Sequence, residues 1–112
     1  MLSRFALSIT PETNVGARTA APALYRAADL PGIEPRTKEI IRATANELLD
    51  LPATSLAPFH VAIEIEGDEE DPADLARHFG VAATFAARTG DAAALDVLRA
   101  AESASIALME RR

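Results

Sequence analysis

The 112-residue sequence contains no cysteine and no tryptophan. The absence of cysteine excludes disulfide bonds, thiol nucleophiles and cysteine-ligated zinc. Phenylalanine and tyrosine together supply five positions, whereas alanine supplies 25. We therefore expect a core built largely from small side chains, in which helices approach closely and each contact buries little area.

Positive charge and long apolar runs are also scarce. Eleven Lys and Arg face 17 Asp and Glu, which gives a net charge of −6. Nucleic-acid binding depends on neutralising phosphates with basic side chains, so this balance predicts no nucleic-acid partner and no docking on anionic lipid. No segment approaches the ~18 apolar residues of a membrane span, and residues 1–10 lack the apolar run of a signal peptide. We expect no membrane partner and a cytoplasmic location.

What the chain does contain is enough apolar sequence for one folded unit. Hydrophobic residues make up 49% of the chain, which argues against disorder. A chain of this length hides roughly two-thirds of its unfolded surface on folding. The sequence therefore predicts a single domain over residues 1–112.

Two segments alternate between apolar and other residues. In FHVAIEIEG the large apolar residues occupy the odd positions, which are Phe59, Val61, Ile63 and Ile65. The segment RFALSIT shows the same period of two. A helix would scatter the apolar residues of 59–66 around its axis, whereas a strand places them on one face. We predict two strands, 2–9 and 59–66, paired as a ribbon; a helical 59–66 remains the alternative.

Four segments show helical periodicity and are bounded by proline, glycine or a capping aspartate. Pro22 suits a first turn, Pro35 opens the next helix, and Asp71 and Asp91 can cap the last two. The expected helices are 20–30, 35–50, 72–88 and 91–110. The predicted fold is α+β and predominantly helical, in the order β-α-α-β-α-α. The alternative is an all-α antiparallel helical bundle.

The candidate catalytic residues are His60 and Glu64. On a helix they would be one turn apart and could share a proton as an acid–base pair. On a strand they would be ~13 Å apart, beyond direct contact. The strand interpretation makes them part of a solvated strand face, where charges discourage edge-to-edge aggregation.

Two further groups of polar residues suggest no site. The acidic run Asp68–Asp71 with Asp74 does not match a calcium-loop pattern and is explained by a turn and a helix cap. His78 follows Asp74 by one helical turn, which predicts a surface pair. We expect no metal and no cofactor.

A third pattern concerns the order of Pro35, His60 and Gly90. A proline-started helix, then a histidine, then a glycine and further helices resembles the helical carboxymuconolactone-decarboxylase-like enzymes. The resemblance implies a small helical enzyme with His60 and Glu64 as acid–base groups. The paired cysteines of that family's redox members are absent from this sequence.

The last helix carries more apolar surface than one core-facing stripe needs. A seam of small residues repeats at spacings of three and four along it. We predict that this seam forms a homodimer interface, with packing on the chain's own 41–48 helix as the alternative. The predicted function is a small acidic, non-enzymatic protein–protein interaction module whose partner is a second copy. The predicted interface residues are Ala94, Val97, Ala101, Ala104 and Leu108.

Overall fold

The computed structural model describes residues 2–13, 15–67 and 71–111. The predicted α+β class and element order are confirmed, and the all-α alternative is wrong because 59–66 is a strand. The elements are β1 (Leu2–Ile9), α1 (Ala17–Ala28), α2 (Pro35–Leu49), β2 (Phe59–Glu66), α3 (Pro72–Thr89) and α4 (Ala92–Glu110).

The two strands form an antiparallel ribbon in which Leu2 lies opposite Glu66 and Ile9 lies opposite Phe59. Both strands have the predicted bounds. Side chains alternate between two faces of a strand, and here the odd-numbered residues turn toward the helices. We call that side the inner face and the side of the even-numbered residues the outer face. The buried inner-face residues are Phe5, Leu7, Ile9, Phe59, Val61, Ile63 and Ile65.

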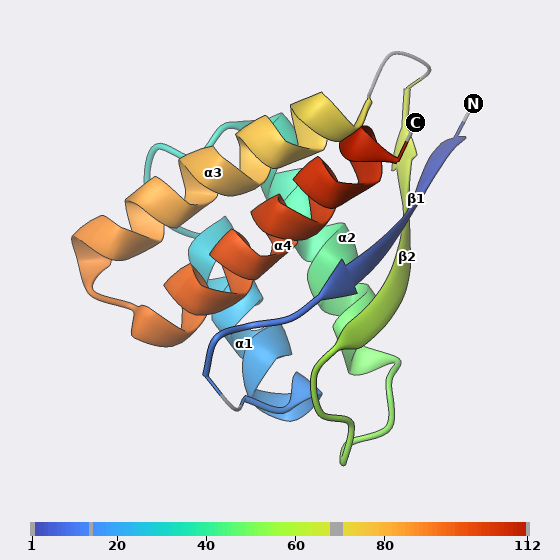
Figure 1. Cartoon of the computed structure of the whole chain (residues 1–112). Coiled ribbons are helices and arrows are strands. Elements are labelled where there is room, and N and C mark those ends of the chain that lie inside the picture. The colour runs from blue at the N-terminus through green and yellow to red at the C-terminus, as the bar shows by residue number, and fades with distance from the viewer. Residues whose placement is uncertain (1, 14, 68–70, 112) are drawn as a thin grey trace.

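The helices lie on one side of the ribbon, as Figure 1 shows. α4 packs against β1 and α2 packs against β2, while α1 and α3 complete the helical part by packing on α2 and α4. Alanines at these contacts are almost fully covered, for example Ala20, Ala45 and Ala82. The expected core of small side chains is therefore present.

The ends of α3 and α4 follow the predicted chemistry. Asp71 and Asp74 form a reciprocal capping box at the start of α3, with Pro72 in its first turn. Gly90 ends α3 with a positive φ of 75°, a conformation that glycine adopts without strain. The side chain of Asp91 accepts the backbone N–H of Ala94 and so caps α4. These local signals fix the turn between the two helices.

The predicted bounds of the first helix are wrong. The segment 20–30 was expected with Pro22 in its first turn, but α1 begins at Ala17, so that Pro22 lies inside the helix. The start is set by a distant segment: the backbone of Gly16 pairs with Leu56, and the N–H of Ala17 donates to the carbonyl of Ser55. Pro22 is exposed, so water can reach the helix carbonyl that its missing N–H leaves unpaired. Such a contact is outside the reach of local sequence signals.

Candidate interaction surface

The proposed acid–base residues are not brought together. His60 and Glu64 both lie on the outer face of β2, four residues apart and exposed. Strand geometry places them ~13 Å apart, so they cannot share a proton directly. Glu64 stands opposite Arg4 in the ribbon.

His60 instead contacts Ser8 of the opposite strand. The distance between the Ser8 Oγ and the His60 Nδ1 is 2.8 Å. A serine beside a histidine is one component of a nucleophilic site, which also needs a group that orients the histidine. Within the described ranges, no third residue bonds to His60, and both partners are exposed to water. Among the residues that the structure describes, the pair has no group that would orient His60 and so activate the serine.

The other histidine departs from its prediction as a surface residue. His78 is 2% exposed and lies between α2 and α3. Its Nδ1 is 2.7 Å from the hydroxyl of Thr37, which is also buried. The residue before it, Arg77, approaches the other ring nitrogen at 3.3 Å. This contact joins two helices inside the protein, where a substrate has no access.

The predicted interface residues of α4 face the chain's own interior. Four of them are buried, and Leu108 is half-buried against the core. The elements that α4 packs against are α3, α1 and β1, and not chiefly the 41–48 helix of the stated alternative. Self-association stays a prediction, but a second copy would need another surface. The four buried residues are Ala94, Val97, Ala101 and Ala104.

A different surface is open along β1. The sheet has two strands, so each strand is an edge. Among the described residues, no backbone bond joins β1 to any segment except β2. One row of N–H and C=O groups on β1 therefore faces away from β2 without a backbone partner in the part of the chain that the structure describes. An open edge of this kind accepts a further strand.

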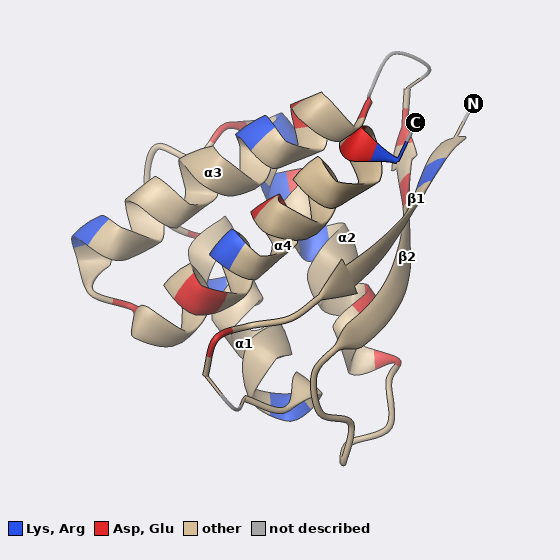
Figure 2. Ribbon diagram, in the orientation of Figure 1, with Lys and Arg blue, Asp and Glu red and all other residues tan. Residues whose placement is uncertain are grey.

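The two edges differ in charge. β1 carries one charged residue, Arg4, whereas β2 carries Glu64 and Glu66. The Arg36 guanidinium also donates to the backbone carbonyl of Glu66. Figure 2 shows charge on the ribbon only toward the N-terminal end of β1 and the C-terminal end of β2. Because charges on an edge strand oppose strand addition, β1 is the less protected edge.

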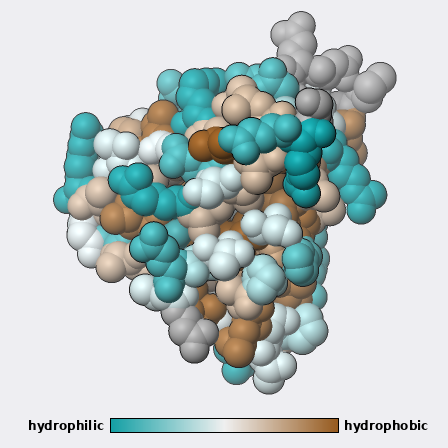
Figure 3. Space-filling view, in the orientation of Figure 1, coloured by the Kyte–Doolittle hydropathy of each residue, from teal (hydrophilic) through white to brown (hydrophobic). Residues whose placement is uncertain are grey.

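Two separate hollows lie near β1 and α4. Helices pack ~8–10 Å apart, whereas paired strands are ~4.8 Å apart, so a two-stranded ribbon is too narrow to cover its helices. One hollow of about 500 Å³ is lined by residues 6–8 and 60–62 of the ribbon and by Leu108 and Arg111. A second, of about 450 Å³, lies between residues 10–13 and the outer side of α4. Figure 3 shows pale, weakly polar residues with brown apolar atoms between them here.

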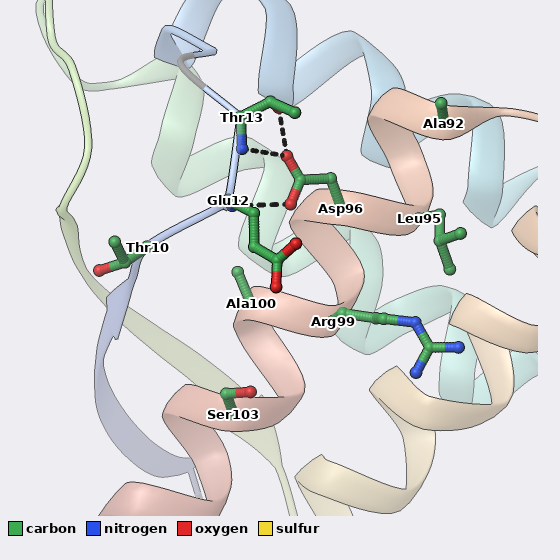
Figure 4. Close-up of a pocket in the computed structure, with 9 residues that line it drawn as sticks. All are labelled: Thr10, Glu12, Thr13, Ala92, Leu95, Asp96, Arg99, Ala100 and Ser103. Atoms are coloured by element: carbon green, nitrogen blue, oxygen red, sulfur yellow. Dashed lines mark hydrogen bonds between the residues drawn. The ribbon is translucent and has the colours of Figure 1, made fainter.

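One carboxylate, that of Asp96, holds the chain segment that lines the second hollow. Asp96 of α4 accepts the backbone N–H groups of Glu12 and Thr13 at 2.8 and 3.0 Å, and also the Thr13 hydroxyl. Figure 4 shows both residues approaching Asp96 from the segment after β1, while Arg99 points away from it. Burial raises the pKa of Asp96, but the hydrogen bonds from Thr13 and Glu12 outweigh it, so that this pKa lies below its ordinary value of 3.8. Asp96 thus fixes the path of the chain beside β1.

The described part of the chain shows neither a group of metal ligands nor a helix that could cross a membrane. Over residues 2–13, 15–67 and 71–111, no three His, Cys, Asp or Glu side chains gather as metal ligands. Residues 68–70 of the acidic run lie outside these ranges. No helix that the structure describes has the length and apolar character needed to cross a membrane.

Three comparisons with known proteins found no match to this chain. No family model matches the chain, and neither a curated protein nor a solved structure matches it. The open edge of β1 and the hollow beside it are the surface features that point to a function.

Proposed function

We propose that this chain is a non-enzymatic protein–protein interaction module that works in the cytoplasm as a homodimer. The observation that carries the proposal is the free edge of β1, which has little charge and lies beside a hollow lined mostly by small and apolar residues. Main-chain groups at such an edge supply hydrogen bonds to a partner, and the adjoining hollows receive its side chains.

The acidic net charge supports a protein partner over nucleic acid. The enzyme alternative required His60 and Glu64 to act together, and their positions on β2 keep them apart. A cyclic twofold dimer is the commonest assembly among homo-oligomers. The dimer surface differs from the α4 seam predicted from the sequence, because that seam is already covered by the chain's own core.

Analytical ultracentrifugation of the wild type tests the proposal. We expect a species of twice the 11.9 kDa chain mass at tens of micromolar protein. A clean monomer at that concentration would end the homodimer proposal.

A matched pair of variants then locates the surface. Ala6 and Ala62 lie opposite each other on the outer face, Ala6 on β1 and Ala62 on β2. Ala6→Lys adds a charge to the open β1 edge and should weaken the dimer about tenfold or more, since edge lysines oppose strand addition. Ala62→Lys adds the same charge to the neighbouring strand and should weaken it much less. Circular dichroism checks whether both variants stay folded.

A further inference from the structure

We draw no further inference here: the strongest candidate, the hollow of about 450 Å³ between residues 10–13 and the outer side of α4, is lined by the exposed side chains of Glu12 and Arg99, and nothing in the structure shows what would fill it.

Discussion

The two faces of the ribbon lie in opposite environments, because the inner face is buried and the outer face is in contact with water. On the inner face, Phe59 and Ile63 are almost completely covered, and Ile63 is 0% exposed. On the outer face, His60 and Glu64 stand in water one residue away from them. The apolar period of two decides which residues hold the fold together. The same period leaves the even-numbered side chains on the solvated face, and the two-stranded sheet leaves the backbone edge of β1 open.

The largest expected effect is on the inner face. Ile63→Asp places an unpaired carboxylate among the buried residues of the ribbon and should cost about 4 kcal/mol or more of unfolding free energy. Glu64→Lys, one residue along, reverses a solvated charge opposite Arg4 and should change that free energy by no more than about 1 kcal/mol. Urea denaturation of the two variants makes the comparison. Equal midpoints would contradict the division of the ribbon into two faces.

A second comparison extends the same contrast to α4. Ala101 is 0% exposed and lies in the helix that packs on α1, α3 and β1, so Ala101→Glu should destabilise the monomer fold by about 3 kcal/mol. Ser103→Glu, two residues along on the exposed side, serves as the control and should stay near the wild type. Thermal melts followed by circular dichroism measure both. A fully stable Ala101→Glu variant that has merely become monomeric would restore the α4 seam as a dimer interface.

The parts of the fold that local patterns encode could be predicted from the sequence. The period of two gave both strands, and α2, α3 and α4 end within one residue of the expected positions. Proline, glycine and aspartate mark these ends by satisfying or omitting particular backbone bonds. The hydrogen bonds that these residues make or omit lie within one turn of helix. The helix ends can therefore be predicted without knowledge of the tertiary structure.

The parts of the fold that depend on contacts between distant residues could not be predicted from the sequence. The start of α1 follows from the backbone of Ser55 and Leu56, and the burial of His78 follows from Thr37 on another helix. The pattern along α4 indicates an apolar seam, but a sequence pattern does not say whether an apolar stripe faces the chain's own core or another chain. The open edge of β1 carried one available signal: a fold with only two predicted strands leaves both of them as edges.

A smaller effect is expected where α4 holds the segment after β1. In Asp96→Asn, one acceptor oxygen becomes an N–H₂ donor that faces the backbone N–H of either Glu12 or Thr13. The loss of charge-assisted hydrogen bonds should cost about 1–2 kcal/mol at pH 7. Glu102→Gln is the control, since within the described residues the side chain of Glu102 makes no hydrogen bond or ion pair. Urea denaturation of both variants gives the difference.

The pH dependence of this difference follows from the direction of the pKa shift. The pKa of Asp96 is lower in the folded protein than its ordinary value of 3.8. Its contribution to stability is therefore fully present above about pH 4 and is lost as the pH falls through the lower folded-state pKa. The gap between the wild type and Asp96→Asn should close on acidification below pH 4. A gap that stays constant down to pH 2 would show that Asp96 acts without its charge.

The smallest effect is expected on the outer face, at His60. His60→Ala removes an exposed contact with Ser8, and such contacts change the unfolding free energy by less than about 0.5 kcal/mol. Ser8→Ala removes the same contact from the other strand, so the two variants and the double variant should melt together, with a coupling energy near zero. Sedimentation of His60→Ala should still give the wild-type dimer, because His60 lies on β2, away from the β1 edge. A loss of more than about 1 kcal/mol in His60→Ala, or its dissociation to monomer, would show that the outer face contributes to stability or binding and would break the contrast between the two faces.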